Sequence, residues 1–246
     1  VGRFNGDAFD DIAVAVETAQ KVAILLGNGD GTFQTPQFID TNRSPQFITA
    51  ADINADTFED LLVGVNDFPG GVAAHLGNGD GTFDAPSLIF ALDSSLYIQN
   101  IEVADMDQDM FQDVVVMAGY SDPVDSKGTS QFSGGFFLLY GLEGGGLEAA
   151  VYQPGNGSDP GQGSAADIDG DGVLDLISAS GTTLDVSVLL GNGDRTFLPE
   201  QRYNMNRPGR FNFGGGGGAR FQIYDANEDG LKDIVAVFGL VSEIQS

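Results

Sequence analysis

The sequence contains no cysteine, no tryptophan and a single histidine among its 246 residues. The absence of cysteine excludes disulfides and thiolate metal sites. With one histidine, His75, the chain cannot build a histidine-based zinc site or an ordinary nucleophile dyad. No apolar stretch approaches the about 20 residues that span a bilayer. We therefore expect a structural His75, no membrane insertion and no catalytic residues.

Basic residues are also scarce, with 10 Lys and Arg against 36 Asp and Glu and a formal net charge of −26. Such a charge excludes nucleic acid and anionic membrane surfaces as expected partners. Hydrophobic residues make up 41% of the chain and include 18 Phe, which is ample for a core. A fold without disulfides can be held by millimolar calcium outside the cell. We expect an extracellular, cell-surface or periplasmic location.

A nine-residue acidic motif recurs along the chain. It reads DIDGDGVLD from Asp167, DINADTFED from Asp52, DMDQDMFQD from Asp105, DANEDGLKD from Asp225 and, in a damaged copy, RFNGDAFDD from Arg3. Oxygen ligands at positions 1, 3, 5 and 9, with a backbone carbonyl at position 7, can surround one ion with about seven oxygens. This donor set suits Ca²⁺ better than Mg²⁺, which requires a stricter octahedron.

We number these copies loop 1 (3–11), loop 2 (52–60), loop 3 (105–113), loop 4 (167–175) and loop 5 (225–233). The predicted ligands in loops 2 to 5 are Asp52, Asn54, Asp56, Phe58, Asp60, Asp105, Asp107, Asp109, Phe111, Asp113, Asp167, Asp169, Asp171, Val173, Asp175, Asp225, Asn227, Asp229, Leu231 and Asp233. Thr57 and Met110 replace the glycine at position 6 of loops 2 and 3, where left-handed backbone would cost about 1 kcal/mol or more.

Loop 1 differs because Arg3 occupies its first ligand position and Ala8 its sixth. Arginine cannot ligate a cation, and its guanidinium can instead pair with Asp7 or Asp11. The weaker ligand set of this loop is Asn5, Asp7, Phe9 and Asp11. We expect about four Ca²⁺ ions, and a fifth only if loop 1 also holds one.

The loops begin at residues 3, 52, 105, 167 and 225, and intervals of about 50 residues indicate propellers, solenoids or arrays. Helical calcium hands are the alternative, but each loop is followed by a short apolar run, as in DLLVGV from Asp60. Such runs predict buried strands. The glutamate that a helical hand carries at its twelfth position is also missing.

A second repeat completes the unit, with VAILLGNGDGTF from Val22, VAAHLGNGDGTF from Val72 and VSVLLGNGDRTF from Val186. Asn and Gly there favour a turn between two strands. Each unit then reads as strand A, acidic loop, strand B, strand C, glycine-rich turn and strand D. In the second unit we expect A at 47–51, B at 61–65, C at 72–76 and the start of D near Thr82.

Four antiparallel strands per repeat predict an all-β fold, a β-propeller of four-stranded blades in a single domain over 1–246. About five blade units are expected. The first lacks strand A and the last ends after strand B, so the ring is open or partial and the chain is expected to be a slice of a larger propeller. Open blade edges can pair with further blades or another chain.

These repeats resemble the FG-GAP or VCBS family of integrin α-subunit propellers and many bacterial surface proteins. The resemblance implies a calcium-stabilised extracellular module for protein interaction, structure or adhesion, with other protein subunits as partners. A carbohydrate-binding, lectin-like module with surface glycan as ligand is the alternative. The third hypothesis is that the chain is part of a polysaccharide-degrading enzyme, which would use acids such as Asp122, Asp125 and Asp159.

Five of the ten basic residues fall between Arg195 and Arg220, interleaved with aromatic residues. The candidate partner contacts are Arg202, Arg207, Arg210, Phe211 and Phe213. They lie near the irregular segments 119–135, 154–164 and 204–218, which we expect on the face opposite the acidic loops. Alternatively, the arginines pair with neighbouring acidic loops and the phenylalanines fill the core.

Overall fold

The computed structural model describes residues 1–67, 70–92, 96–120, 134–155, 160–180, 185–204, 219–228 and 230–238. These residues form five β-sheets, and their only helical element is the 3-10 turn η1 (Glu17–Ala19). None of the described helical structure is long and apolar enough to cross a membrane. The prediction of an all-β fold is confirmed.

The strands follow the repeats of the sequence. The first sheet holds β1 (Ile12–Val16), β2 (Lys21–Leu25) and β3 (Gln37–Asp40). The second holds β4 (Pro45–Ala51), β5 (Asp60–Val65), β6 (Gly71–His75) and β7 (Ser87–Ala91). The third holds β8 (Leu96–Ala104), β9 (Asp113–Tyr120), β10 (Gly135–Leu139) and β11 (Val151–Pro154). The fourth holds β12 (Pro160–Ala166), β13 (Asp175–Ser180), β14 (Asp185–Leu189) and β15 (Gln201–Asn204), and the fifth pairs β16 (Ala219–Tyr224) with β17 (Asp233–Phe238).

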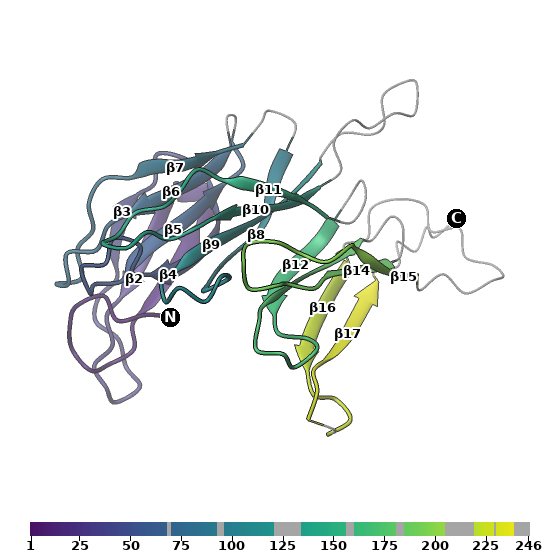
Figure 1. Cartoon of the computed structure of the whole chain (residues 1–246). Coiled ribbons are helices and arrows are strands. Elements are labelled where there is room, and N and C mark those ends of the chain that lie inside the picture. Colours follow the sequence, from purple (N-terminus) through teal and green to yellow (C-terminus); the bar gives the residue numbers. More distant parts are fainter. Residues whose placement is uncertain are drawn as a thin grey trace, which may run out of the picture. The chain divides into compact units, whose positions relative to one another are not determined.

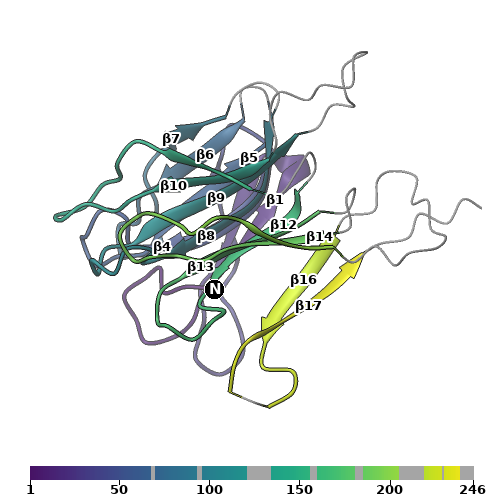
Figure 2. The same ribbon diagram turned by 45° about the vertical axis from the view of Figure 1, so that its right-hand side comes forward.

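In every sheet the strands lie side by side in chain order, which is the up-and-down arrangement of a propeller blade. The pairing is antiparallel throughout the second and fourth sheets. Figure 1 and Figure 2 both show β16 and β17 as an adjacent pair joined by one loop. The first sheet has three strands and lacks strand A. An isolated bridge between Gly2 and Asp11 takes the place of the last residue pair between strands A and B in the other blades, such as Ala51 and Asp60 in the second.

The second blade tests the predicted strand positions most directly. Strands A, B and C lie within one or two residues of their expected bounds, as β4, β5 and β6. Strand D was expected near Thr82, yet β7 begins at Ser87. The intervening residues form a compact turn, closed by a bridge between Gly77 and Phe83 and by a 2.8 Å hydrogen bond from the Asp84 amide to the Leu76 carbonyl.

Contacts divide the chain into two compact units. Unit 1 is Val1–Ala104, Met110–Val116 and Leu138–Val151, and unit 2 is Asp105–Asp109, Met117–Phe137 and Tyr152–Ser246. Within unit 1, β4 contacts both β1 and β8, and within unit 2, β12 contacts β16. Within each unit, neighbouring blades therefore meet through the first described strand of each sheet.

Each unit contains a core between adjacent blades. In unit 1, alternate residues of β2 and β5 supply it, including Val22, Ile24, Leu61 and Val63. In unit 2, Ile177, Val188 and other residues of β13 and β14 pack with Phe221 of β16. Strands β5, β6, β13 and β14 are buried along their whole length, so both of their faces are covered. This explains why apolar residues stand on both faces of these strands, with only a few buried polar residues such as Ser178 and Ser187 among them.

The buried second strand predicts a clear difference between two leucines of one blade. Leu61 on β5 is completely buried, whereas Leu88 on β7 is 49% exposed. Truncation of Leu61 to alanine should cost about 2–5 kcal/mol of unfolding free energy because it leaves a cavity. Leu88→Ala should cost less than about 1 kcal/mol. Urea denaturation of both variants measures the difference, and equal losses would contradict this packing.

Candidate metal-binding loops

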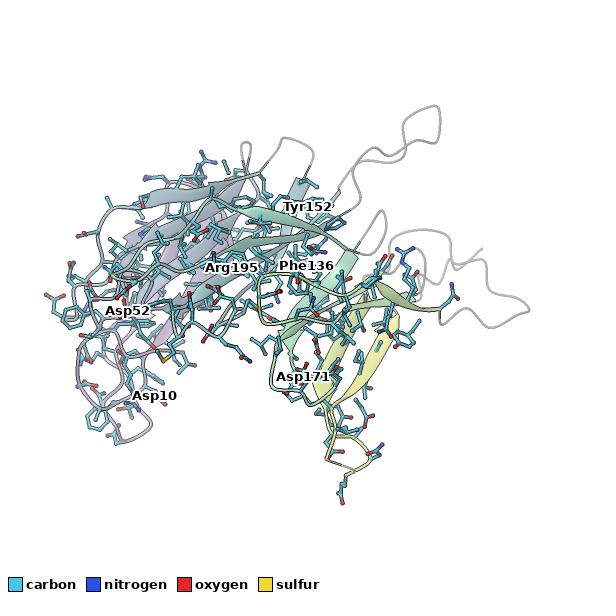
Figure 3. The ribbon with its side chains drawn as sticks, viewed as in Figure 1. Asp10, Asp52, Phe136, Tyr152, Asp171 and Arg195 are labelled. Carbon is cyan, nitrogen blue, oxygen red and sulfur yellow. The ribbon has the colours of Figure 1, made fainter. Side chains whose placement is uncertain are left out.

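The acidic loops lie where the sequence places them, between the first two strands of each blade. Loop 2 joins β4 to β5, loop 3 joins β8 to β9, loop 4 joins β12 to β13 and loop 5 joins β16 to β17, while loop 1 precedes β1. Figure 3 shows Asp171 on the connection between β12 and β13. The chain thus presents the predicted ligands on strand connections, where they can converge.

The last residue of each loop is an aspartate, which we call the closing aspartate (Asp11, Asp60, Asp113, Asp175 and Asp233). The Asp60 carboxylate is completely buried and accepts hydrogen bonds from the backbone amides of Ile53 (3.0 Å) and Gly77 (2.8 Å). One amide belongs to the second position of loop 2 and the other to the glycine-rich turn. The closing aspartate therefore ties the loop to the turn of its own blade.

The same arrangement recurs in the other blades. Asp11 accepts from the amides of Phe4 and Gly27, both at 2.8 Å, and Asp175 accepts from Ile168 (2.8 Å) and Gly191 (2.9 Å). The matching bonds at the remaining loops join the Gly141 amide to Asp113 (2.7 Å) and the Ala226 amide to Asp233 (2.9 Å). In the first four blades the acidic loop and the glycine-rich turn therefore lie at the same end of the blade.

The turn glycine that donates to the closing aspartate has no room for a side chain. A Cβ at Gly77 would strike the carbonyl oxygen of Glu59. This close approach brings the Gly77 amide within reach of the Asp60 carboxylate. Burial raises the pKa of the Asp60 carboxyl, against the lowering effect of the two amides, and the nearby Asp56 and Asp52 raise it further. A positive charge in loop 2 would relieve this repulsion.

The remaining acids of loop 4 shape its backbone. Asp167 accepts from the amides of Gly170 (2.7 Å) and Gly172 (3.0 Å). One oxygen of Asp169 accepts from the Asp171 amide (3.2 Å), and one oxygen of Asp171 accepts from the Val173 amide (2.7 Å). Because a carboxylate has two oxygens with two lone pairs each, these turns leave acceptor capacity at positions 3 and 5.

Left-handed backbone occurs at two positions of the loops. At position 6, Thr57 and Met110 have φ of 78° and 74°, as predicted despite their Cβ atoms. Position 4 is also left-handed, at Ala55, Gln108 and Glu228 with φ of 59° to 63°. Loops 1 and 4 have glycine at this position, Gly6 and Gly170 with φ of 69° and 81°, and these two glycines were the available signal. The two left-handed residues curl the chain around the centre of the loop.

Three carboxylates converge in two of the loops. One oxygen from each of Asp167, Asp169 and Asp175 lies within 4.8 Å of the others in loop 4. Asp105, Asp107 and Asp113 form an equivalent group in loop 3. Both groups join positions 1, 3 and 9 of the motif, and their donors are exclusively oxygen. Such clusters could hold a hard cation.

Loop 2 places Asn54 at position 3, and its amide oxygen accepts from the Asp56 backbone at 3.0 Å, as the carboxylate does in loop 4. In loop 5 the Asp225 carboxylate accepts from the Gly230 amide at 2.9 Å. The predicted ligand Asp229 lies outside the described residues. The backbone frame of both loops therefore follows that of loop 4.

Loop 1 confirms the departure expected from its sequence. Arg3 pairs with Asp10 at 3.3 Å, not with the expected Asp7 or Asp11. Asp7 instead accepts from the Asn5 amide group (2.8 Å) and the Phe9 backbone amide (2.8 Å). Each oxygen of Asp11 accepts a hydrogen bond from a backbone amide. Ala8 is not among the left-handed residues, so loop 1 lacks the second curl.

The turns contain an acidic residue whose role the sequence did not reveal. Asp30, Asp80 and Asp194 each accept hydrogen bonds from the amide and hydroxyl of the threonine two residues later. The threonine hydroxyl and amide lower the pKa of these aspartates. These acids therefore cap the turns. The pattern DxT, present in all three turns, was the available signal.

The candidate partner contacts are only partly described. Arg202 lies on β15 and pairs with Glu200 at 3.2 Å, whereas Arg207, Arg210, Phe211 and Phe213 lie outside the described residues, as do Asp122, Asp125 and Asp159. Phe221 fills the core of unit 2, and Arg195 pairs with Asp107 of loop 3. The alternative interpretation is therefore correct for these two residues: Phe221 fills the core, and Arg195 pairs with an acidic loop.

His75 has the structural setting expected for it. It lies on β6, is 1% exposed and contacts the Asp84 carbonyl through Nδ1 at 3.3 Å. Burial lowers the pKa of its imidazole, which favours the neutral form. An uncharged ring inside a fully buried strand is consistent with packing.

Sheets of up to four strands in chain order, with an acidic loop between the first two strands, define a repeat protein built from β-propeller-like blades. The chain belongs to the FG-GAP-like repeat family, whose model matches residues 3–63, 52–116 and 167–236. The suspected FG-GAP membership is thereby confirmed.

No curated protein matches the chain. Among solved structures it is similar to that of a lectin from Agrocybe aegerita, titled for specific recognition of non-reducing terminal N-acetylglucosamine. The identity is 17% and the TM-score 0.40, with 93% of this chain and 75% of the lectin covered. A likeness at this level carries no argument about function.

The closing aspartate can be tested in loop 1, where Arg3 replaces the first ligand. Asp11→Asn keeps the size of the side chain but turns one acceptor oxygen into a donor that faces a backbone amide. We expect a loss of about 2 kcal/mol of unfolding free energy, measured by urea denaturation with excess EDTA. The neighbouring Asp10→Asn, which only removes an exposed ion pair, should change stability by less than about 1 kcal/mol. Equal effects would contradict the role of Asp11.

Proposed function

We propose that the protein is a calcium-stabilised extracellular module that serves protein interaction, structure or adhesion and performs no catalysis. The convergence of Asp167, Asp169 and Asp175 within 4.8 Å carries the calcium part of this proposal. Residues at positions 1, 3, 5 and 9 and the position 7 carbonyl would hold the ion in each intact loop. The ion would supply positive charge to a group of carboxylates that otherwise repel one another.

The donor set favours calcium over other metals. The clustered ligands are carboxylates, and the chain contains no cysteine and a single histidine. Oxygen-only sites suit hard cations, and the larger, more flexible coordination shell of calcium tolerates sequence variation between loops better than magnesium does. Loops 2 to 5 would bind about four ions.

The interaction role is supported by the surfaces of the blades. The last strands of the sheets, β3, β7, β11 and β15, carry exposed apolar side chains. Phe38 is 57% exposed, Leu88 49%, Tyr152 41% and Tyr203 49%. Exposed apolar side chains and terminal strands are common contact surfaces for other proteins. With a net charge of −26, contact with nucleic acid or an anionic membrane is disfavoured.

Calcium binding should stabilise the native protein, because the ion has no preformed site in the unfolded chain. Each occupied loop adds about 2.7 kcal/mol at a free calcium concentration one hundred times its dissociation constant. We therefore expect EDTA to lower the melting temperature measured by calorimetry. An unchanged melting temperature would contradict the calcium proposal.

Two matched variants locate the effect. Asp171 and Asp7 occupy the same loop position, and each uses Oδ1 to accept a backbone amide at 2.7 Å or 2.8 Å. Asparagine can retain that acceptor while it removes the charge and turns the second oxygen into an NH2 group, which at Asp7 faces the exposed Asn5 amide group. Asp171→Asn should reduce the calcium-induced rise in melting temperature, whereas Asp7→Asn in loop 1 should leave it nearly unchanged.

The role in protein interaction is tested by affinity purification. The calcium-loaded protein is the bait, and the extracellular fraction of the cells that produce it is the source of partners. We expect a protein partner that is lost in EDTA, and no calcium-dependent signal from the same protein on a glycan array. A specific glycan signal without a protein partner would favour the lectin-like alternative.

A further inference from the structure

The turn between β14 and β15 carries a charged residue where the other turns have glycine. Its fifth residue is Arg195, and the equivalent residues are Gly31, Gly81 and Gly145. All four have left-handed backbone, with φ of 68° at Arg195 and 85° to 94° at the glycines. An L-residue in this conformation is strained relative to glycine, and the contacts of the arginine side chain can offset that strain.

Those contacts are with the acids of loop 3. The Arg195 Nε atom lies 2.5 Å from Oδ2 of Asp107, and Nη2 lies 3.7 Å from Oδ2 of Asp109. Figure 3 labels the position of Arg195. The Asp107 side chain is only 7% exposed, whereas the Arg195 side chain is 36% exposed, so the carboxylate is the partner that is shielded from water. Shielding strengthens the attraction and makes the loss of one partner costly.

The Arg195 guanidinium contacts the Asp107 oxygen that the backbone leaves open for an ion. Oδ1 of Asp107 accepts from the Asp109 amide at 3.3 Å, as the position 3 aspartate does in loop 4. Oδ2, the remaining oxygen, is the one that Arg195 contacts. Gln108 adds a second link, because its side-chain amide donates to the Gly172 carbonyl of loop 4 at 2.8 Å.

We propose that Arg195 is the resident cation of loop 3. Its guanidinium neutralises Asp107 and Asp109 and holds the loop in shape without a metal. A divalent ion must displace it from Asp107, so loop 3 binds calcium more weakly than loop 4. The competition rests on the proposed calcium function, whereas the neutralisation by Arg195 does not.

Two substitutions separate charge from backbone strain. Arg195→Gln keeps a long side chain on the same left-handed backbone and removes the charge, and Arg195→Gly restores the residue of the other turns. Melting temperatures are measured in EDTA and in calcium, and calcium is titrated by isothermal calorimetry. Arg202→Gln is the control, because Arg202 lies on β15 and pairs with Glu200, just before that strand.

We expect Arg195→Gln to melt at a lower temperature than the parent protein in EDTA. Both Arg195 variants should show a larger rise in melting temperature on calcium addition. Their calcium titrations should show one site that is at least tenfold tighter than in the parent. Adding Asp107→Asn to Arg195→Gln should abolish the gain, and Arg202→Gln should behave as the parent.

The outcomes also distinguish this inference from the calcium function. Unchanged melting in EDTA for Arg195→Gln would overturn the resident-cation role. A destabilised variant with an unaltered calcium titration would overturn the competition while leaving calcium binding by the other loops intact, provided that Asp171→Asn still weakens the titration. If no variant binds calcium, the competition and the proposed function both fail.

Discussion

The burial of one carboxylate at the end of each acidic loop is the constraint on which the blade depends. In the second blade, the two oxygens of Asp60 accept amides from the loop and from the turn, which lie 24 positions apart at Ile53 and Gly77. These bonds fix the connection between the first two strands against the connection between the last two. A neutral side chain with one acceptor could not satisfy both amides. The feature that recurs from blade to blade is therefore an aspartate held inside the protein.

A buried charge has an electrostatic cost, and the loops show how it is offset. Burial raises the pKa of Asp60 and Asp175 although backbone amides oppose the shift. The other acids of each loop increase the repulsion, so a cation bound among them would stabilise the closing aspartate as well as the loop. This couples metal binding to folding. Arg3 and Arg195 place a basic side chain against acids of loop 1 and loop 3, which reduces the need for an ion there.

Much of the blade could be predicted from sequence because its signals are local. Short apolar runs after each loop predicted β5 and β13, and the glycine at position 77 predicted the turn. The start of β7 was placed too early, since a bridge at Phe83 closes the turn before the strand begins. Left-handed backbone at Ala55 and Gln108 had only an indirect signal, because the glycine that favours it stands at the same position of loops 1 and 4 and not in loops 2 and 3. The pairing of Arg195 with Asp107 spans 88 positions, and nothing local to either residue selects the partner.

The same constraint limits where a partner can bind. Loop carboxylates are engaged by amides, by an arginine or by the proposed ions, so little of their charge remains to attract a ligand. The turns are equally committed, because Asp30, Asp80 and Asp194 cap their own threonines. Contacts with other proteins would then fall on surfaces with exposed apolar side chains, such as Phe38 on β3 and Tyr203 on β15. The acidic repeats thus build the scaffold, and in the proposed function the recognition of a partner would fall to residues that vary between blades.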